Sequence, residues 1–83
     1  MAGPRRTNPQ VDHSMPEIAR IGRVVADRRI ALRLTQQTLA DVAGVSRSTV
    51  QAVERGSGAV KFGSLIEIVE ALGLHMDVSL GAQ

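Results

Sequence analysis

The 83-residue sequence contains no cysteine, no tryptophan and no tyrosine. Without cysteine the chain can form neither a disulfide framework nor a thiolate-ligated metal site, which fits a reducing, cytoplasmic location. Its one aromatic residue is Phe62. Because RNA and single-stranded DNA are usually held by bases stacked on aromatic side chains, the scarcity of aromatics makes double-stranded DNA the better candidate for a nucleic-acid ligand.

The sequence also lacks the residue groupings on which most enzyme sites depend. The glycine-containing segment 56–58 is not followed directly by the lysine of a phosphate-binding loop. His75 and Asp77 could begin a metal site, but no third ligand is evident. Glu67 and Glu70 lie three positions apart, as acid-base carboxylates on a helix would, although a solvated face explains them better. We therefore expect no enzymatic activity, no metal and no cofactor.

Charge is distributed unevenly along the chain. Residues 1–33 carry seven arginines against three acids, whereas residues 56–83 carry one lysine against three acids, for a net charge of +2. Such an uneven charge distribution suits a protein that faces a polyanion on one side, although a random scatter of surface arginines would look the same.

Residues 1–15 are rich in proline, glycine and polar residues without a regular period, and we expect a flexible arm. No apolar segment accompanies Arg5 and Arg6, so we expect neither a signal peptide nor a membrane anchor. The two arginines could follow a DNA groove, or they could belong to a disordered leader.

Apolar periodicity predicts a helical domain over residues 16–73. A first helix is expected from Pro16 to about Leu34, a second over about 36–43, a third over about 47–55, and a fourth from about 62 that ends at Gly73. The side chains expected to face the core are Ile18, Ile21, Val25, Leu32, Leu39, Ala40, Val42 or Ala43, Val50, Val53, Phe62, Leu65, Ile66, Ile68, Val69 and Leu72.

The two short central helices have their own start and stop signals. Thr35 is a favourable N-cap, and Leu34 can pack on Leu39 as a hydrophobic staple. Ser46 repeats the arrangement for the next helix. Gly44 between them supplies the left-handed conformation that ends one helix and lets the next leave steeply. Local chemistry therefore predicts a helix-turn-helix.

The segment Leu34–Gly56, LTQQTLADVAGVSRSTVQAVERG, resembles the lambda-repressor-like (Xre/Cro) helix-turn-helix domains, over about residues 18–73. The resemblance implies an all-α bundle of four to five helices that binds DNA. It also implies an ion pair between Arg29 and Glu54 that joins the first helix to the third. The matching residues are Thr35, Gln36, Leu39, Ala40, Gly44, Val45, Ser46, Val50, Glu54 and Gly56, with Arg29 seven positions before Gln36.

With Val50 and Val53 inward, the third helix turns Arg47, Ser48 and Gln51 outward, where we expect them to meet base edges. The guanidinium of Arg47 matches guanine, the amide of Gln51 matches adenine, and the Ser48 hydroxyl can pair with several bases. For Gln51 an ordinary solvated face is the alternative, and for Arg47 a plain surface position, although a cation at a helix start is mildly unfavourable.

Further predicted DNA contacts position the protein without specifying sequence. Gln36 can donate to a phosphate beside the free N–H groups at its helix start, and Thr49, Arg55 and Ser46 are further candidates for DNA contacts. Lys61, after the third helix, could contact a phosphate or be an ordinary solvated lysine.

After residue 73 the apolar period changes from helical to alternating. Leu74, Met76, Val78 and Leu80 alternate with polar residues, which predicts a β-strand within a C-terminal segment 74–83. Since a lone strand needs a partner, we expect it to pair across a twofold homodimer. A frayed tail with accidental alternation is the alternative.

The segment ALGLHMDVSL looks like the end of HipB-type antitoxins, whose additional strand forms a dimeric lid. This likeness implies a repressor that binds a near-palindromic operator and autoregulates its operon, with a HipA-like kinase toxin as a partner. Glu67 and Glu70 would offer the docking surface. A stand-alone Xre-type repressor and a protein-interaction adaptor remain open alternatives.

Overall fold

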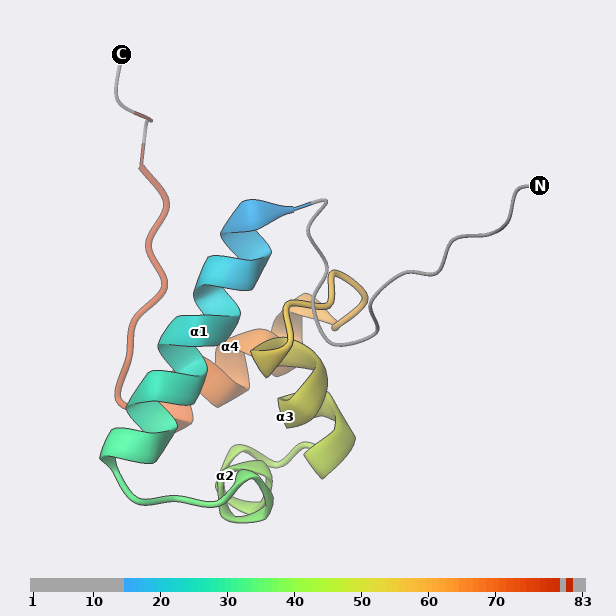
Figure 1. Cartoon of the computed structure of the whole chain (residues 1–83), viewed down its shortest axis with the longest axis vertical. Helices are drawn as coiled ribbons and strands as arrows, with labels where there is room; N and C mark the ends of the chain where they lie inside the picture. Colours follow the sequence, from blue (N-terminus) through green and yellow to red (C-terminus); the bar gives the residue numbers. More distant parts are fainter. Residues whose placement is uncertain (1–14, 80, 82–83) are drawn as a thin grey trace, which may run out of the picture.

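The computed structural model describes residues 15–79 and 81, and within that part it contains four α-helices and no β-strand (Figure 1). The helices are α1 (Pro16–Ala31), α2 (Gln36–Ala43), α3 (Arg47–Glu54) and α4 (Phe62–Ala71). The predicted all-helical fold is therefore confirmed, with four helices. The predicted N-terminal arm, with Arg5 and Arg6, lies outside the described residues except for Met15.

The core lies where the four helices meet. Helix α1 packs on α3, and α2 packs on both α3 and α4. The buried apolar side chains are Val25, Leu39, Ala40, Ala43, Val50, Val53, Ile68, Val69 and Leu72. All of them were expected to face inward from helical periodicity, so the interior follows directly from the sequence pattern.

Two of the expected core positions are wrong. Leu32 is 41% exposed and Phe62 is 67% exposed. Leu32 is the C-cap of α1, and Phe62 is the first residue of α4. Of the two alternatives at the end of α2, Ala43 is the buried one.

All four helices end in the same backbone arrangement, in which the residue after the C-cap or the C-cap itself adopts a left-handed conformation. At the end of α1 the Leu34 N–H donates to the Arg29 carbonyl at 3.0 Å, and the Arg33 N–H donates to the Ile30 carbonyl at 2.9 Å. The left-handed residues are Arg33, Gly44, Gly56 and Gly73, with φ angles of 61°, 76°, 83° and 73°. Arg33 alone among them is not glycine.

Helices α1 and α3 approach so closely that their contact excludes side chains. A Cβ atom on Gly22 would overlap the Val53 carbonyl oxygen of α3. A Cβ on Gly56, at the end of α3, would lie 3.1 Å from the Ala19 Cα of α1. We call this contact between Ala19, Gly22 and Gly56 the α1–α3 seam.

The predicted strand does not form in the single chain. Residues 74–79 run alongside α1 as extended chain, and no backbone hydrogen bond holds residues 75–79 within the described part of the structure (Figure 1). Leu74 and Met76 are half-buried against the core, whereas Val78 is 93% exposed. A strand requires a paired neighbour, which one copy of the chain does not supply. Leu80 lies outside the described residues.

One long-range hydrogen bond fixes the end of α4. The Arg28 Nε of α1 donates to the Leu72 carbonyl oxygen at 3.0 Å, so the last turn of α4 is capped by a side chain from another helix. The start of the C-terminal segment is thereby attached to α1.

Candidate nucleic-acid interface

Capping residues fix the starts of α2 and α3 and the turn between these helices. The Thr38 N–H donates to the Thr35 hydroxyl oxygen at 2.9 Å, and the Thr49 N–H donates to the Ser46 hydroxyl oxygen at 3.1 Å. Gly44 has the left-handed conformation that joins the two helices. The Ser46 hydroxyl, one of the predicted DNA contacts, is therefore occupied as the N-cap of α3.

Helix α3 buries one side and presents polar side chains on the other. Val50 and Val53 are buried, whereas Arg47 and Ser48 are exposed at the start of the helix and Gln51 is half-buried. The side of α3 opposite the core thus carries a guanidinium, a hydroxyl and a carboxamide. We call Arg47, Ser48 and Gln51 the reading face.

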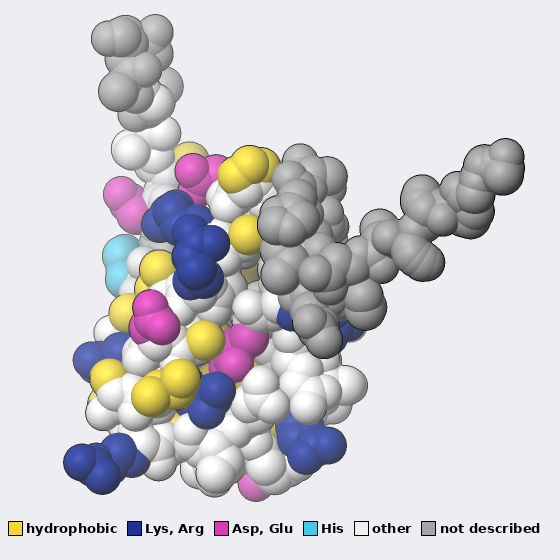
Figure 2. All heavy atoms as spheres, viewed as in Figure 1, with side chains coloured by type: hydrophobic (Ala, Val, Ile, Leu, Met, Phe, Trp, Pro, Cys, Tyr) yellow, Lys and Arg dark blue, Asp and Glu magenta, His cyan; other side chains and the backbone are white. Residues whose placement is uncertain are grey.

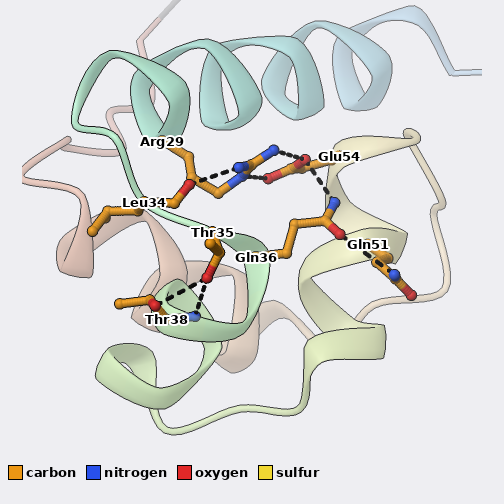
Figure 3. Close-up of polar contacts among 7 residues, drawn as sticks. All are labelled: Arg29, Leu34, Thr35, Gln36, Thr38, Gln51 and Glu54. Atoms are coloured by element: carbon orange, nitrogen blue, oxygen red, sulfur yellow. Dashed lines mark hydrogen bonds and ion pairs between the residues drawn. The ribbon is translucent and has the colours of Figure 1, made fainter.

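Behind the reading face, an ion pair connects α1 to α3 (Figure 3). The Arg29 Nε lies 2.6 Å from Glu54 Oε2, and a second guanidinium nitrogen donates to Oε1 at 3.1 Å. The remaining nitrogen donates to the Leu34 carbonyl at 2.8 Å. Both side chains are mostly buried, with 14% and 10% exposed. The hydrogen bond that Arg29 donates to Glu54 raises the pKa of Arg29, and burial opposes this effect only in part.

Two glutamines extend the network of polar contacts around the ion pair. Gln36 Nε2 donates to Glu54 Oε1 at 3.0 Å, and Gln51 Nε2 makes a longer contact of 3.4 Å with Gln36 Oε1 (Figure 3). A chain of polar contacts therefore leads from Arg29 through Glu54 and Gln36 to Gln51. Sequence reasoning assigned Gln36 to a phosphate and missed this role, because no local signal links residues 18 positions apart.

Three of the predicted phosphate-contacting residues gather at one place, whereas Gln36 and Ser46 are not part of it. Thr49, Arg55 and Lys61 line an open hollow between α3 and the start of α4, which Ser57 and Ser64 also line. Arg55 and Lys61 are exposed, and Thr49 is half-buried. The hollow therefore combines two cations with hydroxyl groups. Ser57 and Ser64 were not predicted, and only their nearness to Lys61 in the sequence could have suggested them.

The face of the molecule that carries α1 has no continuous basic area. In Figure 2, Lys and Arg side chains on this face lie in separate places, with Asp and Glu between them. The arginine-rich composition of the first 33 residues therefore does not produce a single patch on this side of the described structure.

The residues considered for other functions do not form sites. Among residues 15–79 and 81, no three His, Cys, Asp or Glu side chains are grouped as metal ligands would be. Glu67, Glu70, His75 and Asp77 are all exposed. In the same part of the chain, none of the helices combines the length and the hydropathy that a membrane span requires.

The helical domain resembles known proteins. A family model described as Helix-turn-helix matches residues 25–78, a range that contains α2, α3 and α4. The restriction-modification controller protein C.AhdI from Aeromonas hydrophila has a similar structure, with 31% identity and a TM-score of 0.65 over 74% of this chain and 92% of that chain.

A curated relative, described as an uncharacterized transcriptional regulator in the ATPase CF(0) region of Rhodospirillum rubrum, is 41% identical over 59 residues. The match covers 71% of this chain and 55% of the relative, so the chain spans about half the length of that protein. One relative is described as a controller protein and the other as a transcriptional regulator. Together with the family match, they confirm the prediction that the chain is not an enzyme.

Proposed function

The chain belongs to the helix-turn-helix family, and from this premise we propose that it is a transcriptional regulator that binds double-stranded DNA at a specific sequence. The observation that carries this proposal is the reading face. Arg47 and Ser48 are exposed on a helix that is capped at its start by Ser46 and anchored by buried Val50 and Val53. A helix held in this way can enter a major groove with its first residues toward the bases.

Base recognition follows from the chemistry of the reading face. The planar fork of Arg47 suits the O6 and N7 acceptors of guanine, and the carboxamide of Gln51 suits the N6 donor and N7 acceptor of adenine. Arg55 and Lys61, with the serines of the hollow between α3 and α4, would hold a phosphate and set the depth of the helix in the groove. Because its ligand is DNA, the protein would act in the cytoplasm.

The functional unit is a twofold homodimer paired through residues 74–80. In support, the backbone of residues 75–79 has no partner in the described part of the chain, and Val78 is 93% exposed. Two copies would present their α3 helices about 34 Å apart, to successive major grooves of a near-palindromic operator. Occupancy of that operator would block RNA polymerase.

Arg47→Ala tests the assignment. We expect the variant to bind the operator about 1–3 kcal/mol more weakly and to lose selectivity at one base position. Its melting temperature should not change, because the Arg47 side chain is exposed and makes no ion pair among the described residues. Selection of bound sites from random duplexes, followed by titration, measures both effects.

Arg23→Ala is the matched control, since Arg23 is an exposed arginine on α1, away from the reading face. It should retain the selectivity of the original protein. Identical site preferences for the Arg47→Ala variant and the original protein would contradict the role of the reading face.

Stand-alone regulation is better supported than an antitoxin role, because the two relatives are described as a controller and a regulator. An antitoxin would need a surface for its kinase toxin, and the exposed Glu67 and Glu70 on α4 offer one. Repeated pull-downs from the native cell, with Glu67→Lys/Glu70→Lys as the control bait, would decide between the two. Failure to recover a kinase would exclude the antitoxin.

A further inference from the structure

We propose that Glu54 is a positioning residue that sets base preference, because through Gln36 it determines which end of the Gln51 carboxamide faces the DNA. The expected consequence is a preference for adenine over guanine at the base read by Gln51. This inference rests on the proposed function and adds to it a residue that does not itself reach the DNA.

The first step is the orientation of Gln36. An ionised carboxylate only accepts hydrogen bonds, so the Gln36 group that lies 3.0 Å from Glu54 Oε1 must be the NH2 group. The carboxamide of Gln36 is planar, and its oxygen therefore points the other way, toward Gln51 (Figure 3). The charge on Glu54 thus decides which end of Gln36 faces the reading face.

The second step is the orientation of Gln51. The oxygen of Gln36 can only accept, so Gln51 must turn its NH2 group toward it, at 3.4 Å. One of the two N–H groups of Gln51 is used in this contact. Its oxygen and its second N–H group remain available, and Figure 3 shows the oxygen directed away from Gln36.

The third step is the match to a base. Adenine presents one donor and one acceptor in the major groove, which one oxygen and one N–H group satisfy together. Guanine presents two acceptors, and to satisfy both Gln51 would have to give up its contact with Gln36. The chain of contacts from Glu54 therefore favours adenine over guanine.

Glu54→Gln tests the role of the carboxylate. A glutamine at position 54 can offer either its oxygen or its NH2 group to Gln36, so both amides are free to turn over. We expect the ratio of affinities for adenine and guanine duplexes to fall by about tenfold, within the range measured for one good base contact. The position to compare is the one whose selectivity is lost in Gln51→Ala.

Arg29→Met is the matched control. It also breaks the ion pair and should lower the melting temperature, but it leaves the carboxylate of Glu54 in place to accept from Gln36. Its adenine-to-guanine ratio should stay close to that of the original protein. The affinities of both variants are measured well below their melting temperatures and are corrected for the fraction of protein that can bind DNA.

Gln36→Met is the second variant. If Glu54→Gln does not fold, Gln36→Met still tests whether the contact through Gln36 sets the adenine-to-guanine ratio. It removes the link to Gln51 and leaves the ion pair intact, so the ratio should fall as in Glu54→Gln. A phosphate contact by Gln36 would weaken binding to both duplexes equally and would leave the ratio unchanged.

Three results would overturn the inference: an unchanged ratio in Gln36→Met, an unchanged ratio in a folded Glu54→Gln, or an equal fall in Arg29→Met and Glu54→Gln. The last result would mean that the ratio depends on the intact ion pair and not on the Glu54 carboxylate by itself. Failure of the original protein to select any sequence would instead overturn the proposed function.

Discussion

At the scale of single residues, Arg33 is the exception among the helix ends. Its φ of 61° places it in the left-handed region, which the other three helix ends fill with glycine. An L-residue with a Cβ pays about 1 kcal/mol or more for this conformation. The Arg33 side chain is exposed and makes no ion pair among the described residues that would compensate for the strain.

We therefore expect Arg33→Gly to stabilise the protein by about 1 kcal/mol, after allowance for the greater freedom of glycine in the unfolded chain. Urea unfolding monitored by circular dichroism measures the difference. Gly44→Ala is the reverse control. Gly44 has the same left-handed conformation, and an added Cβ would meet no neighbouring atom, so alanine there should lower the stability by a similar amount. A loss of stability in Arg33→Gly would show that the arginine side chain has a stabilising contact.

Local signals could be predicted from the sequence, whereas contacts between distant residues could not. Thr35 and Ser46 cap their helices because the chemistry of an N-cap involves only the next three residues. The bond from Gln36 to Glu54 depends on how α2 packs against α3, which no spacing rule supplies. The exposure of Phe62 is likewise set by its place at the start of α4, not by its hydrophobicity.

At the scale of elements, the α1–α3 seam determines how α3 is held. Gly22 allows the α1 backbone to reach the Val53 carbonyl, and Gly56 lies against Ala19. This close approach also brings Arg29 of α1 within reach of Glu54. Backbone atoms on both sides of the seam leave little freedom for local adjustment.

Gly22→Ala should accordingly destabilise the protein by about 2–3 kcal/mol, at the upper end for an overpacked core. This is a large share of the stability of so small a domain. Gly63→Ala is the matched control, because Gly63 is also helical but has no atom near its Cβ, and alanine there should stabilise α4 by about 0.5 kcal/mol. Equal melting temperatures for the two variants would contradict the packing of the seam.

The C-terminal segment marks the limit of element prediction from sequence. Alternation predicted a strand through Leu74, Met76 and Val78, but only the first two side chains pack against the core, since that pattern reports which side of the chain is apolar and not what covers it. It could not supply the hydrogen-bonding partner that makes an extended segment a strand. Pairing of this segment as a strand across two chains therefore stays a prediction.

At the scale of the whole molecule, the described chain leaves one apolar side chain almost fully in solvent at the end of an anchored segment. Leu74 and Met76 hold the segment to the core, and the bond from Arg28 to Leu72 fixes its origin. Val78 then projects with 93% exposed surface. An anchored segment that ends in an exposed valine suits pairing with a second copy.

We expect Val78→Asp to shift the protein toward monomer, with dimer affinity reduced by about 2 kcal/mol or more, because the carboxylate would be buried without a partner. Operator binding should weaken as a result. Sedimentation velocity over a range of concentrations measures the association. Ser79→Asp adds the same charge at an exposed neighbouring position and should leave the dimer intact; an unchanged dimer in Val78→Asp would exclude pairing through this segment.

The α1–α3 seam meets the last residues of α3, whereas Arg47 and Ser48 are its first two, and this separation bears on how the protein can evolve. Arg47 is exposed and has no ion pair among the described residues, so under the proposed function its substitution would change base recognition without disturbing the core, whereas the Ser48 hydroxyl lies 3.0 Å from the Ser46 hydroxyl that caps α3. New binding specificities would therefore be accessible by single substitutions of Arg47. Substitution of Gln51 is more constrained, because its amide contacts Gln36, which in turn donates to Glu54 of the ion pair between α1 and α3.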